Sequence, residues 1–219
     1  QISSNDLFKV GDWVEAPQFG ADGDVKDIAL HTVKIQNWDK TISIIPTHKL
    51  IDSSFKNWKG MSDSGGRRIK RSIYIDMNSI KFCDNQMLDT YKSITLLTDY
   101  IHDKISDISK HNTSKDIDKS DINGRALTNI GTYRAYIKAY LKNNVNIHKD
   151  MTFLVRQLSP TERGLPIEIY VFSNNTDWIE YEEIQSDIFD HLIAASSQFG
   201  LRIFQYPTGN DLNKISQNV

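Results

Sequence analysis

The sequence predicts a mixed fold in which a small antiparallel β-barrel precedes an α+β domain. Two observations carry this prediction. Residues 8–46 are rich in β-branched and aromatic side chains interrupted by Gly, Asp and Asn, which is typical of short strands joined by tight turns. Residues 67–206 instead alternate strand-like segments with longer stretches whose apolar residues recur near every 3.6 positions, as in helices that pack on a sheet.

The first region divides into four expected strands. They are placed at residues 8–15, 25–31, 32–37 and 41–46. The second strand carries Ile28 and Leu30 on one face, because successive side chains of a strand point to opposite sides. The third does the same with Val33 and Ile35. Residues 37–40 (NWDK) then supply a tight reversal, so a small antiparallel barrel is expected.

A change in composition marks the expected domain boundary. Residues 49–55 are consistent with a helical turn, and residues 61–66 form a Ser- and Gly-rich segment that is typical of a linker. We therefore expect one domain over residues 1–66 and a second over residues 67–219. The residues expected at the junction are Gly65, Gly66, Arg67 and Arg68.

The second domain is expected to run strand, helix, helix, strand, strand, helix, strand. The strands are placed at 67–76, 152–157, 165–173 and 201–206, and the helices at 86–104, 132–143 and 178–198. Residues 111–121 are polar and turn-rich, which predicts a loop. This order favours an α+β sandwich and is compatible with a ferredoxin-like split βαβ arrangement.

Composition excludes several classes of protein. The 26 basic and 28 acidic side chains leave a net charge of -2, so no chain-wide attraction draws the protein to nucleic acid or anionic lipid. Cys83 is the single cysteine, which rules out an intramolecular disulfide framework and fits a reducing compartment such as the cytoplasm. No run approaches the roughly 18 apolar residues of a membrane span. Because the chain starts at Gln1 without an initiator methionine, we expect a fragment or a processed product of something longer.

The sequence offers few groups with the pattern of a catalytic or metal site. Asp187, Asp190 and His191 share one helix face at i, i+3 and i+4, which allows a ligand cluster, but an ordinary charged helix face is the favoured interpretation. Cys83 has no local partner that would activate its thiol. We therefore predict no catalytic, metal-binding or cofactor-binding residues, no cofactor, and a protein that is not an enzyme.

A basic run lies just after the expected linker. Arg67, Arg68, Lys70 and Arg71 form this run, and such a cluster can bind nucleic acid or lipid headgroups. Strand alternation divides these side chains between two faces, which dilutes any patch. The preceding residues 64–66 (SGG) lack the full phosphate-loop pattern, so a domain junction explains them better.

Several motifs together resemble one known family. FKVGDWVE at residues 8–15 and GDVKDIALHTVKIQNWDKTISIIPTHKL at residues 23–50 resemble the β-domain of small-conductance mechanosensitive ion channels. That pattern falls here on Phe8, Lys9, Gly11, Asp12, Val25, Ile28, Leu30, Thr32, Ile45 and Pro46. The later segments TNIGTYRAY, TFLVRQL, LPIEIYVF, IQSDIFDHL and FGLRIFQYPTGND resemble the miniconductance branch of the same family. Asp24 and Thr47 depart from the wider family, which commonly has Gly and Asn there.

The resemblance implies a Sm-like β-domain and an α+β domain that forms a vestibule. It also implies a homo-oligomer, expected to be a heptamer, in a bacterial inner membrane, with this region in the cytoplasm and membrane helices upstream. The family's channels open under membrane tension and release ions and small solutes on osmotic downshock. The partners implied are thus other copies of the chain, the bilayer through those upstream helices, and permeating solutes, with no nucleic acid.

The β-domain carries more aromatic surface than its own small core can obviously bury. We expect neighbouring subunits to cover part of that surface, while internal packing of the same rings is an equal alternative. The candidate residues for the oligomer interface are Phe8, Trp13, Trp38 and Pro46. The leading alternative to a channel domain is a soluble Sm-like oligomer that binds RNA or a small ligand. A third hypothesis is an enzyme whose site is assembled from residues distant in the sequence.

Overall fold

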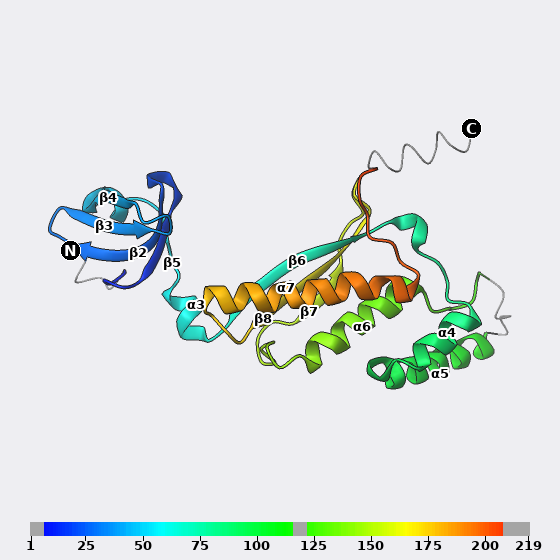
Figure 1. Ribbon diagram of the computed structural model, residues 1–219. Coiled ribbons are helices and arrows are strands. Elements are labelled where there is room, and N and C mark those ends of the chain that lie inside the picture. Colours follow the sequence, from blue (N-terminus) through cyan, green and yellow to red (C-terminus); the bar gives the residue numbers. More distant parts are fainter. Residues whose placement is uncertain (1–6, 116–121, 208–219) are drawn as a thin grey trace. The chain divides into compact units, whose positions relative to one another are not determined.

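The computed structural model describes residues 7–115 and 122–207 (Figure 1). Contacts between residues divide the chain into two compact units, Gln1–Arg67 and Arg68–Val219, which we call the β-unit and the α+β unit. Each unit contains an antiparallel pairing of strands. The predicted mixed fold, with a small antiparallel β structure followed by an α+β structure, is therefore confirmed.

The β-unit is built on one five-stranded sheet with strand order β4-β3-β2-β1-β5. Its strands are β1 (Trp13–Ala16), β2 (Ala21–Ile28), β3 (Thr32–Asn37), β4 (Ile42–Pro46) and β5 (Lys56–Asn57). Its helices are the 3₁₀ turn η1 (Pro17–Phe19), α2 (Thr47–Ile51) and α3 (Lys59–Ser64). All neighbouring strands run antiparallel, as the tight turns of the sequence predict.

Alternation along the strands forms the core of the β-unit. Its buried members are Phe8, Val14, Ala16, Ala21, Val25, Val33, Ile35, Ile45 and Leu50. Strands β2 and β3 approach closely at Gly23, where a Cβ atom would lie 2.0 Å from the backbone oxygen of Gln36. Only glycine fits at this position without moving the backbone of β3.

Three sequence predictions in the β-unit are wrong. The strand expected at residues 25–31 is β2, which ends at Ile28, so Leu30 lies outside it and is 83% exposed. The first strand begins at Trp13 and not at residue 8, because the Asp12 carboxylate accepts a hydrogen bond from the Lys9 backbone N–H at 2.9 Å and holds a turn there. The expected linker at 61–66 is largely helix α3. This helix ends at Gly65, whose φ of 69° is the left-handed conformation that terminates helices.

The α+β unit combines a three-stranded sheet, of order β6-β8-β7, with four α-helices. The strands are β6 (Arg67–Ile75), β7 (Leu154–Gln157) and β8 (Leu165–Ser173). The helices are α4 (Asn85–Lys92), α5 (Thr98–Ser114), α6 (Asn129–Asn143) and α7 (Trp178–Ala195), with 3₁₀ turns η2 (Met77–Ser79), η3 (Thr95–Leu97) and η4 (Ser196–Phe199). Helices α6 and α7 lie along one side of the sheet (Figure 1).

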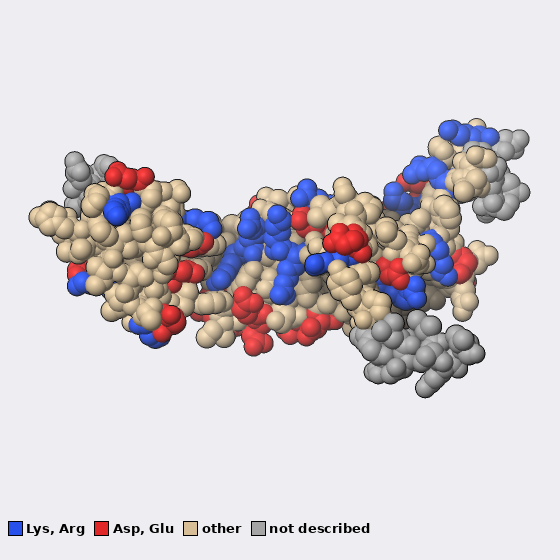
Figure 2. Space-filling model, turned by 90° about the horizontal axis from the view of Figure 1, so that it is seen from above, with Lys and Arg blue, Asp and Glu red and all other residues tan. Residues whose placement is uncertain are grey.

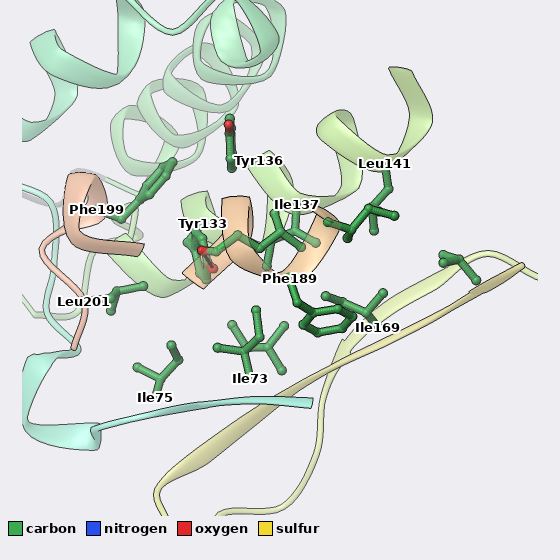
Figure 3. Packing of buried hydrophobic residues seen from close by; sticks show 14 of the residues in the cluster. Ile73, Ile75, Tyr133, Tyr136, Ile137, Leu141, Ile169, Phe189, Phe199 and Leu201 are labelled. Carbon is green, nitrogen blue, oxygen red and sulfur yellow. Dashed lines mark hydrogen bonds between the residues drawn. The ribbon is translucent and has the colours of Figure 1, made fainter. Parts of the chain in front are cut away.

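The core of this unit lies between that helix layer and the sheet. Figure 3 shows the strand residues Ile73, Ile75 and Ile169 directed toward Tyr133 and Phe189 of the helices. All five are at most 6% exposed. The apolar alternation of β6 and β8 and the apolar face of α7 therefore meet in a single layer, as in other α+β structures.

The helix predicted at 86–104 is two helices with a break between them. Helix α4 ends at Lys92, the short turn η3 follows, and α5 begins at Thr98. The Ser93 hydroxyl donates a hydrogen bond to the Thr90 carbonyl at 2.6 Å, and β-branched residues follow it. Side chains that bond to nearby backbone compete with helix continuation, so the apolar period alone misses the break.

The loop predicted at 111–121 is also partly wrong, because α5 continues to Ser114. Asn112 is only 5% exposed, and its side chain bonds both backbone groups of Arg125 at 2.9 and 3.0 Å. This tertiary contact keeps a polar segment helical. Residues 116–121 of the predicted loop lie outside the described residues.

The strand predicted at 201–206 is reduced to an isolated bridge between Ile75 and Ile203. Two backbone bonds flank it, from Asp76 N–H to Arg202 and from Phe204 N–H to Tyr74, both 2.8 Å. The segment thus lies beside β6 without forming a full strand.

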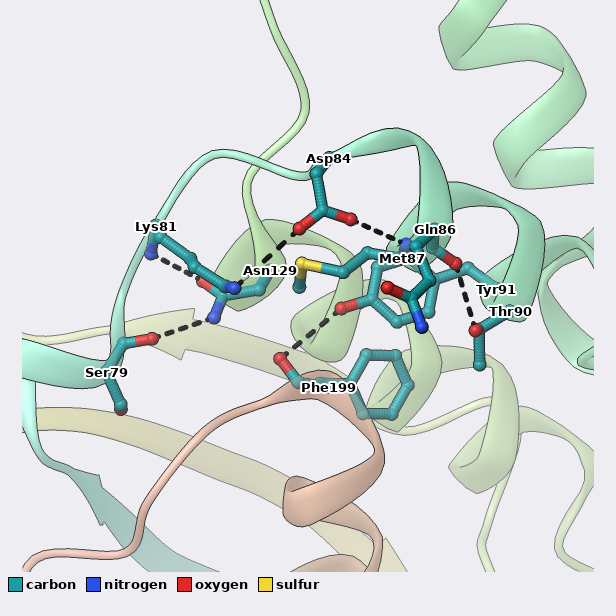
Figure 4. A network of polar contacts seen from close by, with 9 residues as sticks. All are labelled: Ser79, Lys81, Asp84, Gln86, Met87, Thr90, Tyr91, Asn129 and Phe199. Atoms are coloured by element: carbon teal, nitrogen blue, oxygen red, sulfur yellow. Dashed lines mark hydrogen bonds and ion pairs between the residues drawn. The ribbon is translucent and has the colours of Figure 1, made fainter.

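A buried asparagine joins the segment after β6 to helix α6 (Figure 4). The Asn129 side chain is fully buried, accepts from the Lys81 backbone N–H at 3.0 Å and donates to the Ser79 carbonyl at 2.8 Å. Nearby, the Tyr91 hydroxyl donates to the Phe199 carbonyl at 3.3 Å. Because each of these buried polar groups has a hydrogen-bond partner, the bonds offset the cost of removing the groups from water, and the network fixes the start of α6.

Candidate functional site

Trp13 and Trp38, two of the predicted interface residues, belong to a cluster of three tryptophans in the β-unit. The Trp13 ring stacks on Trp58 with 4.6 Å between centroids. It meets the Trp38 ring edge-on at 5.3 Å. Such aromatic pairs contribute about 0.5–1.5 kcal/mol each beyond the area they bury, so the tryptophan cluster stabilises the unit from within.

Two carboxylates accept every indole N–H of the tryptophan cluster. One oxygen of Asp22 accepts from Trp13 at 2.7 Å and from Trp38 at 3.1 Å. Glu15 accepts from Trp58 at 3.1 Å. The polar atoms of the rings are therefore satisfied inside the unit, while Trp38 keeps 36% of its surface exposed. The sequence interpretation connected neither Asp22 nor Trp58 with these rings, although Trp58 is part of the resemblance to the miniconductance branch, because the contacts join residues that are distant in the chain.

Replacing Asp22 with alanine is expected to cost about 1–2 kcal/mol of stability in the β-unit, since it removes two charge-assisted hydrogen bonds. Tryptophan fluorescence measures the change directly: three of the four tryptophans report on this unit, and their emission should shift to the red as the indoles gain water. The matched control is Asp27→Ala, which removes an exposed ion pair with Lys34 and should cost at most about 0.5 kcal/mol. Equal spectra and stabilities for the two variants would contradict the role of Asp22.

Phe8 lies in the core of the β-unit. It is 3% exposed and meets Phe55 edge-on with 5.5 Å between ring centroids. The Phe8 ring therefore packs inside the unit. This agrees with the alternative in which the aromatic side chains are buried internally. Pro46, by contrast, is exposed at the end of β4.

Pro46 extends an exposed apolar stripe on an edge strand. Ile42 and Ile44 of β4 are 56% and 61% exposed, and with Pro46 they share one face because strand side chains alternate. Among the described residues, β3 is the only strand paired to β4. We call Ile42, Ile44 and Pro46 the edge stripe. The sequence interpretation missed its isoleucines, although the period of two in ISIIP was the available signal.

The predicted junction residues lie where α3 passes into β6. Gly65 caps α3, Gly66 is buried, and Arg67 begins β6. The Arg67 guanidinium carbon lies 5.5 Å from the centre of the Trp13 ring. Arg68 lies 5.7 Å from the Tyr170 ring. Both arginines are therefore placed for cation–π contact, each within its own unit.

His191, one of the possible metal ligands on α7, lies against two tyrosines of α6. The His191 ring stacks on Tyr140 at 4.3 Å, and its Nε2 lies 2.6 Å from the Tyr136 hydroxyl. Burial raises the pKa of both tyrosines. Over residues 7–115 and 122–207, no three His, Cys, Asp or Glu side chains gather as a metal would require.

Cys83 is half-buried, and burial raises the pKa of its thiol.

Length and apolar content decide whether a helix can cross a bilayer. None of those between residues 7 and 115 or between 122 and 207 has both the length and the apolar content that crossing a bilayer requires.

Two family descriptions match the chain in succession. The β-domain of mechanosensitive ion channels matches residues 1–60, and the C-terminal domain of the MscS mechanosensitive ion channels matches residues 69–203. The chain belongs to the MscS family of mechanosensitive ion channels. The resemblance to the small-conductance mechanosensitive channel family, identified from the sequence motifs, is thereby confirmed.

Similar proteins agree with membership of the MscS family. An uncharacterized MscS family protein of Helicobacter pylori is 23% identical over 208 residues, which cover 92% of this chain and 29% of that protein. In fold, the chain resembles the Arabidopsis thaliana protein MSL1 (TM-score 0.61, 14% identity, 94% of this chain and 56% of that one). It also resembles Helicobacter pylori MscS in the closed state (TM-score 0.57, 14% identity, 95% and 61%). This MscS-family chain thus spans less than a third of its curated relative.

Proposed function

We propose that this chain is the cytoplasmic part of a tension-gated ion channel in a bacterial inner membrane, where it forms a ring and a vestibule below the pore. In this role it supports the pore and filters ions and small solutes that leave on osmotic downshock. The β-unit corresponds to the ring and the α+β unit to the vestibule. The observation that carries the proposal is the consecutive match of both channel domains to residues 1–60 and 69–203.

Surface chemistry of the β-unit supports a ring of identical subunits. The edge stripe exposes two isoleucines and a proline on a strand with one paired neighbour among the described residues. Such a strand offers both apolar area and free backbone groups to another chain. We propose that neighbouring copies cover Pro46 together with the partly exposed Trp38. A heptamer, and membership of the miniconductance branch, rest on the resemblance in sequence.

Gating follows from the difference in area between two states of a channel. An open pore occupies more bilayer area than a closed one, so tension shifts the equilibrium toward opening. Upstream membrane helices would contain that gate. The described residues would act before the gate, at the point where leaving solutes pass from the cytoplasm to the pore.

Patch recording of the full-length protein tests this function. The gene is expressed with its upstream coding sequence in bacteria that lack their own mechanosensitive channels, and suction is applied to membrane patches. We expect currents that appear only above a threshold tension, together with improved survival of osmotic downshock. Folded, membrane-inserted protein that gives no tension-dependent current would contradict the proposal. A full-length product that is absent from the membrane fraction would contradict it as well and would favour the soluble Sm-like binding role.

A further inference from the structure

The helix-free face of the sheet in the α+β unit is basic. Alternation along β6 directs Ile69 and Ile73 into the core, so Arg68 and Lys70 lie on the opposite face. Arg156 of β7 joins them there, since it pairs with Glu168 of β8. Figure 2 shows Lys and Arg side chains gathered in a band on this unit. Arg68, Lys70 and Arg156 form what we call the basic face.

One buried acid organises the basic face without neutralising it. The Glu168 side chain is 7% exposed and lies 2.7 Å from Arg156 and 4.0 Å from Lys70. Arg68 contacts the Tyr170 ring. Three positive side chains against one carboxylate leave an excess of two positive charges on a surface of about 7 by 10 Å, from strand geometry.

Helix α7 of the same unit is strongly acidic on its outer side. Glu180, Glu183, Asp187 and Asp190 recur at spacings of three, four and three residues, so they share one stripe about 15 Å long. All four are exposed. Residues 178–195 contain no Lys or Arg. We call these four acids the acidic stripe.

The acidic stripe has no cationic partner within the described part of the chain: none of its carboxylates lies in an ion pair there. Four like charges on one helix face repel each other in the isolated subunit. A positive surface laid against them relieves that repulsion. Apolar side chains border both surfaces, with Leu154 43% exposed beside the basic face and Ile179 75% exposed beside the stripe.

We propose that the basic face of one copy of this chain docks on the acidic stripe of the next copy. The two surfaces belong to different layers, the sheet and the helices, so each copy uses one surface for each neighbour. Contacts of this head-to-tail kind generate closed rings when the rotation between copies closes the circle, and open filaments when it does not. The inference rests on the proposed channel function and names the contact that joins its vestibule units.

Paired charge reversals test the contact on the chain of residues 1–219. One variant carries Arg68→Glu and Lys70→Glu, and the other carries Glu183→Lys and Asp187→Lys. We expect each variant alone to associate at least about tenfold more weakly than the unaltered chain in sedimentation velocity at low salt. An equimolar mixture should regain association. The sheet surface of the first variant has become acidic and the helix stripe of the second has become basic, so these two altered surfaces attract each other.

A control variant carries the same change of charge elsewhere. Lys92→Glu with Lys110→Glu alters two exposed lysines of α4 and α5 and should sediment like the unaltered chain. Circular dichroism verifies that every variant is folded. The proposal is overturned if the unaltered chain stays monomeric at about 0.5 mM, a concentration at which even weak contacts form, or if the folded mixture fails to regain association.

The outcome is separable from that of the patch recordings. Tension-gated currents in the full-length protein, combined with reversals that leave association unchanged, would retain the channel function and reject this contact. Loss of association without tension-gated currents would retain the contact and reject the channel function.

Discussion

Replacing Phe199 with alanine is expected to lower the free energy of unfolding of the α+β unit by about 3–5 kcal/mol. Phe199 is 1% exposed and is the last residue of η4, the 3₁₀ turn that follows α7. Its ring lies 5.1, 5.2 and 5.3 Å from the rings of Tyr91, Tyr133 and Tyr136. Alanine would leave a cavity among three tyrosines whose hydroxyls are held in place, by the Phe199 carbonyl, the Leu192 carbonyl and the His191 ring respectively, so the surroundings collapse poorly.

Hydrogen exchange during urea denaturation measures this loss, because it separates peptides of the α+β unit from those of the β-unit. Phe82→Ala is the matched control. Phe82 is 56% exposed, and its truncation should change stability by no more than about 0.5 kcal/mol. If the two truncations cost the same, Phe199 is not the centre of the aromatic cluster.

Replacing Arg156 with methionine is expected to destabilise the α+β unit by about 3 kcal/mol, because it leaves the buried Glu168 carboxylate with a single distant cation. The Arg156 Nε and a terminal nitrogen both contact the same oxygen of Glu168, at 2.8 and 2.7 Å. Lys70 stands 4.0 Å away and is half-exposed. At this longer distance its attraction is weaker than that of Arg156 at 2.7 Å, and it does not replace the lost hydrogen bonds.

A second substitution distinguishes an unpaired charge from lost packing. Adding Glu168→Leu to Arg156→Met removes the buried charge as well and should restore most of the stability. Lys92→Met is the control, since it breaks an ion pair with an Asp89 side chain that is 73% exposed and should cost less than about 1 kcal/mol. A double variant as unstable as the single one in the same exchange measurement would refute this account.

Local alternation predicted the strands best. The strands expected at 32–37 and 165–173 are β3 and β8 with the same bounds, because a period of two over six or more residues has few alternative explanations. The start of a helix was predicted nearly as accurately where a capping residue marks it. The helix expected from residue 178 begins there, where the Asp177 carboxylate accepts hydrogen bonds from the N–H groups of Ile179 and Glu180.

Tertiary contacts decided what the sequence could not show. The contacts of Asn112 with Arg125 keep the end of α5 helical, although its composition is typical of a loop. Aromatic content likewise predicted excess surface in the β-unit without showing which rings are covered. Phe8 is buried and Trp38 is not, and this difference arises from the path of the chain and not from the residue type.

The edge stripe also affects how single copies of this region behave in solution. Ile42 and Ile44 present a β-branched apolar row beside backbone groups that can pair with any extended chain, which is the arrangement that seeds intermolecular β-sheets. A lysine at either position would act as a gatekeeper and keep isolated copies apart. The same lysine would obstruct a neighbour in the proposed ring, so solubility of the single subunit and assembly of that ring would make opposite demands on this strand.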